Sequence, residues 1–100
     1  MKNFEQKVLN LVKKVPKGKV TTYRAIAEQL GYKGLARVVG HALKKNRFLV
    51  IIPCHRVVKS DQRLGGYKNG VEKKLHLLLN EGIKLVRGKI IDWDKVLFKF

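Results

Sequence analysis

The stretch TYRAIAEQLGYKGLARVVGHALK, residues 22–44, decides the fold that the sequence predicts. Thr22 is a good N-cap for a short helix that Gly31 should end, and a further helix is expected over about residues 34–44. The apolar residues of that further helix recur at helical spacing and give it one buried face, made of Leu35, Val38, Val39, Ala42 and Leu43. Two short helices joined by a glycine-containing turn are typical of a helix-turn-helix, whose second helix would present Arg37 outward.

Helices and extended segments are predicted on both sides of this motif. A helix is expected over about residues 4–15, capped by Asn3 with Gln6, and another over about 71–81, capped by Asn69 with Glu72. Between them, a buried extended segment is expected over 48–52 and a polar loop over 60–70. A hairpin over 84–91 should turn at Arg87 and Gly88. The residues expected to fold back onto the core are Trp93, Val96, Leu97 and Phe98. A hairpin behind a helix-turn-helix would be a wing. The expected fold is therefore mainly α with a small β part (α+β), a winged helix-turn-helix forming a single domain over residues 1–100.

Charge is the dominant compositional feature, since 23 Lys and Arg residues face 7 Asp and Glu residues and give a formal net charge of +16. Such a field favours a polyanionic partner, with nucleic acid as the leading candidate, although lysine can also serve only to keep a protein soluble. One cysteine excludes an internal disulfide and a zinc site built from several cysteines, so no metal is expected. No apolar run suggests a secretory signal or a membrane span, so a cytoplasmic location and no membrane partner are expected.

The segment best able to carry chemistry is Pro53-Cys54-His55-Arg56-Val57. A lone cysteine is more often a small buried apolar residue than a nucleophile. Here, however, His55 could take the thiol proton and Arg56 could favour the thiolate. Neighbouring side chains point to opposite faces of a regular strand, so Cys54 can reach His55 only if a turn begins here or a water bridges them.

The same pentapeptide resembles the active-site motif of the O6-alkylguanine-DNA alkyltransferases. The resemblance extends from about residue 4 to about residue 82. Further matching positions are Ala36-Arg37-Val38-Val39-Gly40 in the recognition helix, Asn46, Tyr67, and Asn80-Glu81-Gly82 at the end of the last long helix. It implies the catalytic C-terminal domain of that family without the family's N-terminal domain. It also implies direct repair of double-stranded DNA by a monomer that needs no cofactor or metal. The alkyl group of O6-alkylguanine, or of O4-alkylthymine, would pass once and irreversibly to Cys54, as in a methylated-DNA–protein-cysteine methyltransferase.

The resemblance also assigns roles in the chemistry. A water would link Cys54 to His55, and Glu81 would orient this histidine, as in a catalytic triad. Asn46 would tie the active-site turn to the helix-turn-helix. The hydroxyl of Tyr23 would donate to the extruded guanine, with a core aromatic as the alternative. On the residues alone, Glu81 would be a helix-end carboxylate in solvent, because an acid at that end opposes the helix dipole.

A base must leave the stack before a nucleophile can reach its alkyl group. Arg37 matches the family's arginine that fills the gap, with a phosphate contact or a solvated side chain as the alternatives. The resemblance implies that this helix lies in the minor groove, and Ala36 and Gly40 are small enough to permit such a close approach. Arg56 and Tyr23 complete the expected DNA contacts. The residues expected to line the pocket are Leu43, Val57 and Tyr67. The lysines expected to form only a solvated positive surface are Lys44, Lys45, Lys73 and Lys74.

The sequence departs from the family at Arg47 and Leu49, where prolines are usual, at His41, where glycine is usual, and at Lys68 and Asn69. These departures leave the accepted range of alkyl groups open. Two other functions also stay open. One is a sensor that binds alkylated bases without transfer, like the alkyltransferase-like proteins, which carry tryptophan in place of Cys54. The other is a winged-helix regulator of undamaged DNA, for which no dimerisation helix is recognisable.

Overall fold

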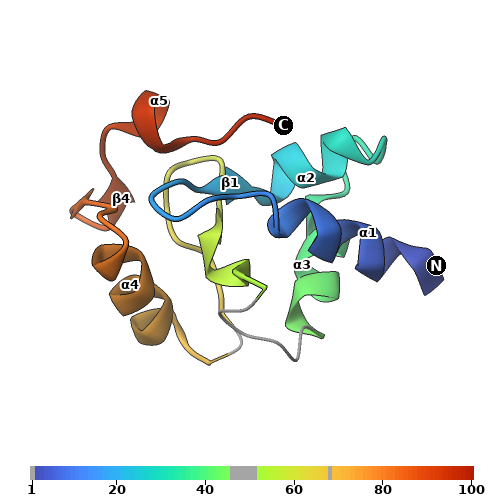
Figure 1. Cartoon of the computed structure of the whole chain (residues 1–100), viewed down its shortest axis with the longest axis horizontal. Coiled ribbons are helices and arrows are strands. Elements are labelled where there is room, and N and C mark those ends of the chain that lie inside the picture. Colours follow the sequence, from blue (N-terminus) through green and yellow to red (C-terminus); the bar gives the residue numbers. More distant parts are fainter. Residues whose placement is uncertain (1, 46–51, 68) are drawn as a thin grey trace.

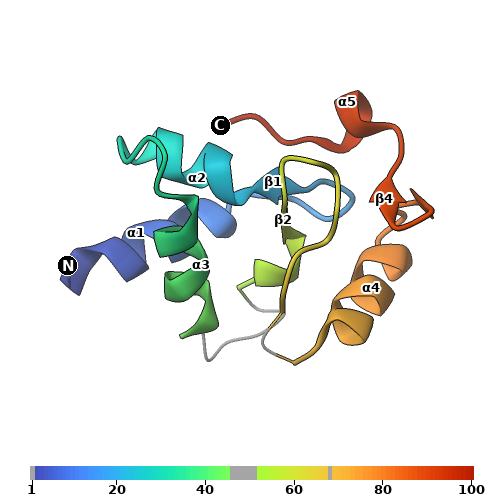
Figure 2. The same ribbon diagram turned by 180° about the vertical axis from the view of Figure 1, so that it is seen from behind.

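The computed structural model describes residues 2–45, 52–67 and 69–100. Its elements are, in chain order, α1 (Lys2–Val12), β1 (Thr21–Thr22), α2 (Tyr23–Gln29), α3 (Ala36–Lys44), the 3₁₀ turn η1 (Cys54–Arg56), β2 (Val57–Val58), α4 (Val71–Asn80), β3 (Leu85–Val86), β4 (Lys89–Ile90) and α5 (Trp93–Val96). Helices dominate and the strands are short, which confirms the predicted α+β class. Helices α1 to α3 lie on one side, α4 and the β3–β4 hairpin lie on the other, and η1 lies between the two groups (Figures 1 and 2).

The predicted helix-turn-helix is present as α2 and α3. Thr22 caps α2, because its Oγ1 accepts a hydrogen bond of 2.9 Å from the backbone N–H of Ala25. Gly31 and Gly34 both have positive φ angles, 82° and 81°, and these left-handed residues turn the chain between the two helices. Since Gly34 is left-handed and Leu35 is the N-cap, α3 begins two residues later than predicted.

Neither predicted capping box forms. Asn3 lies inside α1 instead of before it, and the side-chain amide of Gln6 donates to Asn10 at 2.9 Å. At α4 the N-cap is Gly70, with a φ of 97° and no side-chain cap, so Asn69 lies one residue too early. Helix α1 also ends three residues before its predicted end, because tighter turn hydrogen bonds replace the helical ones there.

A short parallel pairing joins the start of the helix-turn-helix to the active-site turn. Strands β1 and β2 pair in parallel with Thr21 opposite Val57. The two strands are fully buried, so the entry to α2 and the exit from η1 are held at fixed positions. The extended segment predicted over residues 48–52 lies, apart from Ile52, outside the described residues.

The predicted wing is present as the β3–β4 hairpin, which turns at Arg87 and Gly88. Both turn residues have positive φ angles, 52° and 79°, as a two-residue turn between twisted strands requires. After α5 the chain runs back towards α2 (Figure 1), where Leu97 forms a β-bridge with Val20. The tail packs as half-buried and not as fully buried residues, in contrast to the predicted core role.

Two apolar clusters support this arrangement. The first, between α1, α2, α3 and η1, consists of Phe4, Val8, Leu11, Val12, Ile26, Ala27, Val39, Ala42, Leu43, Ile52, Cys54 and Val57. The second, under α4 and the wing, consists of Val20, Val58, Leu64, Leu78, Ile83 and Ile90. The residues of η1 and β2 therefore sit where the two clusters meet. None of the helices in the described part of the chain has the length and apolarity needed to cross a membrane.

Candidate active site and DNA-facing surface

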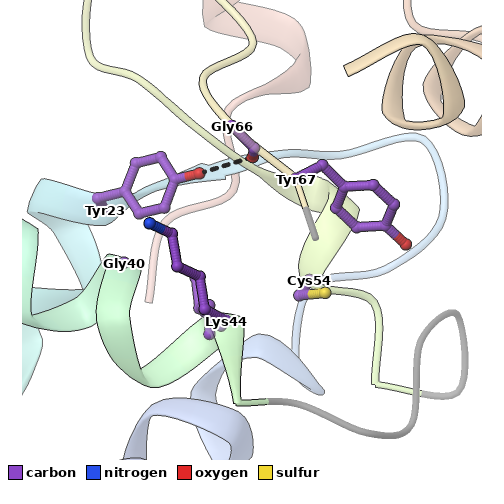
Figure 3. A pocket seen from close by; sticks show the side chains of 7 residues that line it. Tyr23, Gly40, Lys44, Cys54, Gly66 and Tyr67 are labelled. Atoms are coloured by element: carbon purple, nitrogen blue, oxygen red, sulfur yellow. Dashed lines mark hydrogen bonds between the residues drawn. The ribbon is translucent and has the colours of Figure 1, made fainter. Parts of the chain in front are cut away.

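Cys54 opens the 3₁₀ turn η1 and lines a cavity of about 450 Å³. Its side chain is only 6% exposed. The other residues around this cavity are Tyr23, Gly40, Leu43, Lys44, Gly66 and Tyr67. Figure 3 shows Cys54 and Tyr67 on one side of the cavity, with Tyr23, Gly40 and Lys44 on the other. The cysteine therefore faces a space that two tyrosines and the C-terminal half of α3 enclose.

Behind the cysteine, His55, Glu81 and Arg56 form one buried polar network. His55 is fully buried, and its Nε2 lies 3.0 Å from Oε2 of Glu81. Arg56 grips the same carboxylate with two nitrogens, at 2.8 Å and 2.6 Å, and donates a third hydrogen bond to the carbonyl of Val15. A fork of this kind fixes the carboxylate in one orientation. Glu81 is thus a largely buried partner of His55, with 11% of its side chain exposed, and not a carboxylate in solvent.

The direction of Arg56 corrects its predicted contact with DNA. Its side chain is 15% exposed, and its guanidinium turns inward because Glu81 and the carbonyl of Val15 satisfy three of its nitrogens. The structure gives Arg56 the role of holding Glu81 in place.

The electrostatics of the network keep His55 neutral at neutral pH. Burial lowers the pKa of His55 below its ordinary value, and the nearby charges of Arg56 and Lys74 add to this, against the opposing effect of Glu81. For Glu81, burial alone would raise the pKa, but the hydrogen bonds from Arg56 and His55 outweigh it and lower the pKa. A neutral imidazole beside an ionised carboxylate can accept a proton.

The second ring nitrogen of His55 is the atom available for that proton. Its Nδ1 is buried and has no hydrogen-bond partner among the described residues. When Nε2 carries the hydrogen and donates to Glu81, Nδ1 is the acceptor of the neutral tautomer. His55 follows Cys54 directly in the same 3₁₀ turn.

Lys74 is a buried residue that the sequence analysis placed on the solvated surface. It is fully buried in α4, and its Nζ donates to the carbonyls of Val57 and Gly66, at 2.7 Å and 3.0 Å. The same ammonium lies 3.4 Å from the hydroxyl of Tyr23 and 5.6 Å from the centre of its ring. Burial lowers the pKa of Lys74 to about 7. One signal could have found it, because position 74 lies on the apolar face of the helix, four residues before the buried Leu78.

The two tyrosines of the cavity keep their protons well above neutral pH. Burial raises the pKa of Tyr23 and of Tyr67 to about 12, and the negative charge that Cys54 carries when ionised adds to this effect. The hydroxyl of Tyr23 donates to the carbonyl of Gly66 at 3.3 Å (Figure 3). Gly65 allows this loop to lie so close, because a Cβ on it would come within 3.3 Å of the Tyr23 ring and hydroxyl. The hydroxyl of Tyr23 is therefore protonated at neutral pH and is available as a hydrogen-bond donor beside the cavity.

A second hollow of about 400 Å³ adjoins the first along α3 and is strongly basic. It is lined by Tyr23, Arg24, Ala36, Arg37, Gly40, His41, Lys44, Lys59 and Ser60, with no acidic residue. Gly40 leaves its side of α3 open, since a Cβ there would meet only the Tyr23 ring, at 4.0 Å. Arg37 and His41 are both exposed. The expected DNA-contacting residues of α3 thus share one surface, and it opens next to the cysteine cavity.

The remaining predicted site residues fall in different places. Leu43 and Tyr67 line the cavity, as Cys54 and Tyr23 do. Val57 does not, because it is fully buried in β2, where only its carbonyl reaches the site through Lys74. The expected role of Asn46 and the departures at positions 47, 49 and 68 lie outside the described residues. No cluster of side chains that could hold a metal ion occurs in the described ranges.

Comparisons with known proteins agree with this geometry. Residues 3–83 match the family "6-O-methylguanine DNA methyltransferase, DNA binding domain". The chain is 48% identical over 89 residues to a methylated-DNA–protein-cysteine methyltransferase of Sulfolobus acidocaldarius, covering 86% of this chain and 56% of the relative. It is 42% identical to the protein of the same name from Methanothermobacter thermautotrophicus, covering 82% of this chain and 46% of that relative. The chain thus spans about half the length of the curated relatives it matches.

Two solved structures extend the comparison. The crystal structure of Mycobacterium tuberculosis OGT in complex with DNA is 39% identical, with a TM-score of 0.76, covering 79% of this chain and 49% of that one. The structure of S. pombe ATL in complex with DNA is 28% identical, with a TM-score of 0.84, covering 100% of this chain and 98% of that one. The family match includes every described residue of the cysteine cavity and of its polar network. With its cysteine turn and its helix-turn-helix joined at one cavity, this chain belongs to the 6-O-methylguanine DNA methyltransferase family.

Proposed function

We propose that this chain repairs O6-alkylguanine in double-stranded DNA by moving the alkyl group to Cys54 in a single turnover. The observation that carries this function is Cys54 at the wall of a cavity, followed directly by a neutral buried histidine whose Nε2 is held by an ionised carboxylate. A thiolate serves both as nucleophile and as final acceptor, so the reaction needs no cofactor or metal. We further propose that the chain acts as a monomer, and that O4-alkylthymine is a second substrate.

The proton and the alkyl group move in opposite directions in this reaction. His55 takes the thiol proton at Nδ1, through a bridging water, and Sγ attacks the alkyl carbon. The bond between that carbon and O6 breaks, and its electron pair goes to the purine. The hydroxyl of Tyr23 then donates a proton to the departing base, and Lys74 at 3.4 Å is placed to stabilise the phenolate. The product is a thioether, which nothing in the site can cleave.

The target base must first leave the duplex. We propose that α3 lies in the minor groove, that Ala36 and Gly40 permit its close approach, and that Arg37 fills the space left by the base. The basic hollow then lies against the phosphates while the guanine enters the adjoining cavity, which shares Tyr23, Gly40 and Lys44 with it.

The test of this function is the intact mass of the protein after incubation with duplex DNA carrying one O6-methylguanine. We expect one added methyl group, which peptide mapping places on Cys54. The variant Cys54→Ala should still bind the duplex but should gain no mass. A wild-type protein that binds the lesion and remains unmodified would rule out transfer.

Replacing Arg37 by alanine should slow transfer from duplex DNA by about 100-fold, because the extruded state loses the side chain that fills the stack. Transfer from the free base O6-benzylguanine requires no extrusion and should stay within about threefold of wild type. The ratio of the two rates is the measurement. Equal losses on both substrates would mean that Arg37 acts on the cavity and not on the DNA.

A second candidate function is binding of alkylated bases without transfer. The similarity to S. pombe ATL over the whole chain favours it. The mass measurement separates the two, since a sensor binds the lesion duplex but keeps an unmodified Cys54.

A further inference from the structure

A basic loop between α1 and β1 lies on the side of the molecule away from α3. This rear loop (residues 13–19) contains Lys13, Lys14, Lys17 and Lys19 within seven positions. The first three are exposed and Lys19 is half-buried. In Figure 1 the rear loop lies on the near side and α3 on the far side, and Figure 2, seen from behind, reverses the two. The four lysines therefore form a positive surface that is separate from the basic hollow along α3.

The backbone of the rear loop is held firmly against the protein. Arg56 donates to the carbonyl of Val15 at 2.8 Å, and Val15 is only 1% exposed. The ammonium of Lys19 donates to a backbone carbonyl of α5. Gly18 lies against the end of α4, since a Cβ on it would come within 3.6 Å of the carbonyl oxygen of Glu81. A partner that binds here therefore pays little entropy for ordering the loop.

No acidic side chain balances the charge of the rear loop. The sequence contains no Asp or Glu between Glu5 and Glu28. Glu81 adjoins the loop through its backbone, but its carboxylate turns inward to His55 and Arg56. Among the described residues, no ion pair involves a lysine of the rear loop. These positive charges are therefore available to an external anion.

The chemistry of this surface fits a phosphodiester backbone. Lysine binds phosphate as a point charge, and contacts to phosphate need no particular base sequence. A protein partner would instead need exposed aromatic or apolar anchors. Val15 is buried, and apart from its lysines the rear loop exposes only Pro16. The charge without anchors favours nucleic acid over a protein as the partner.

We propose that the rear loop binds the phosphate backbone of a second DNA segment while α3 holds the first, so that one molecule bridges two duplexes. This bridging rests on the DNA binding proposed for α3, but not on alkyl transfer. The two surfaces lie on opposite faces of a molecule that is 20 Å thick in the direction of view. Duplex DNA is stiff over about 150 base pairs, so bending one segment around so small a body is costly. Two separate segments reach both surfaces without this cost.

The experiment measures whether protein bound to one duplex retains another. A biotinylated duplex on beads is saturated with protein at low salt, and a short fluorescent duplex is then titrated onto the beads. The rear-loop variant is Lys13→Gln/Lys14→Gln/Lys17→Gln, and the control variant, which removes equal charge from exposed positions elsewhere, is Lys33→Gln/Lys73→Gln/Lys99→Gln.

We expect wild type and the control variant to retain the fluorescent duplex, and the rear-loop variant to retain it at least about tenfold more weakly. Each phosphate contact contributes about 0.9 to the slope of log K against log salt concentration. The slope for the second duplex should therefore fall by up to about 3 in the rear-loop variant. Binding to the first duplex and transfer from O6-methylguanine should stay near wild type.

Bridging by the rear loop is overturned if wild type on the beads retains no second duplex. Undiminished retention by the rear-loop variant would overturn it too, since paired protein copies would then join the duplexes. An equal loss in the control variant would reduce it to an effect of total charge. Retention of vesicles containing phosphatidylserine in place of the second duplex would also contradict it. None of these results touches alkyl transfer, which the mass of the protein reports separately.

Discussion

Replacing Lys74 by methionine should slow alkyl transfer on the order of 100-fold, because in the proposed reaction Tyr23 would lose the cation that stabilises its phenolate. Methionine has a similar length and keeps the position in α4 filled. The variant should therefore fold, and the loss should appear in the rate of transfer at saturating DNA. Lesion binding should change little, since the Nζ contacts are internal.

The same substitution should also change how stability depends on pH. The pKa of Lys74 is about 7 in the folded protein, against an ordinary value of 10.5. Below pH 7 the lysine is charged in both states, and the cost of burying it is fully present. Between pH 7 and 10.5 only the unfolded chain keeps the proton, so the free energy of unfolding should rise with pH, by roughly 4 to 5 kcal/mol in all. Lys74→Met lacks this rise.

Urea unfolding at pH 7, 8, 9 and 10 measures the difference between the two proteins. The matched control is Lys73→Met, because Lys73 is the neighbouring residue and is exposed. Its free energy of unfolding should change with pH as that of wild type does, and it should transfer alkyl groups at the wild-type rate. Parallel curves for wild type and Lys74→Met would show that the lysine does not pass from charged to neutral on folding in this range.

Replacing Glu81 by glutamine should lower the free energy of unfolding by on the order of 3 kcal/mol. Its carboxylate is 11% exposed and satisfies both His55 and Arg56. Removing one partner from a buried charged network leaves the other charge uncompensated. Transfer should fall on the order of 100-fold or more, because the amide no longer stabilises a protonated His55.

The dependence on pH distinguishes the loss of charge from a general loss of packing. Since the pKa of Glu81 lies below its ordinary value of 4.5 in the folded state, its stabilisation is complete above that value. It is lost as pH falls through the lower folded value. The difference in the free energy of unfolding between wild type and Glu81→Gln should therefore be constant near neutral pH and become smaller at acidic pH.

Glu28→Gln is the control for this substitution. Glu28 forms an exposed pair with Arg24 at 3.4 Å, and such pairs contribute at most about 1 kcal/mol. Near-wild-type transfer by a folded Glu81→Gln protein would contradict the assigned role of the carboxylate.

The residues predicted best were those whose signal is local. The apolar spacing predicted the buried residues of α3, which are Val39, Ala42 and Leu43. The prediction of Leu35 on the same face is wrong, because Leu35 is the N-cap of α3 and is 43% exposed. The paired turn residues Arg87 and Gly88 predicted the wing. The pentapeptide around Cys54 resembled a known active site, and the 3₁₀ turn there satisfies the need for a turn that the strand geometry raised. These patterns depend on a few neighbouring residues, so the sequence displays them directly.

The residues predicted worst depend on contacts between distant parts of the chain. The sequence predicts Lys74 as a surface lysine, but in the structure its Nζ donates to the carbonyls of Val57 and Gly66. The sequence predicts Arg56 as a DNA contact, but in the structure its guanidinium donates to Glu81, at the C-terminal end of α4, and to the carbonyl of Val15. The identity of a long cationic side chain does not indicate which distant residue it will contact in the folded protein.

The bridge between Val20 and Leu97 bears on the order in which this molecule assembles. Val20 donates to Val96 and accepts from Phe98, at 2.8 Å and 2.7 Å, so these bonds join points separated by about three quarters of the chain. Closing a loop of that size has a large entropic cost before any contact rewards it. Helices of this kind form within microseconds from local contacts, whereas this closure raises the contact order, so we expect it to form in a later and slower step of folding.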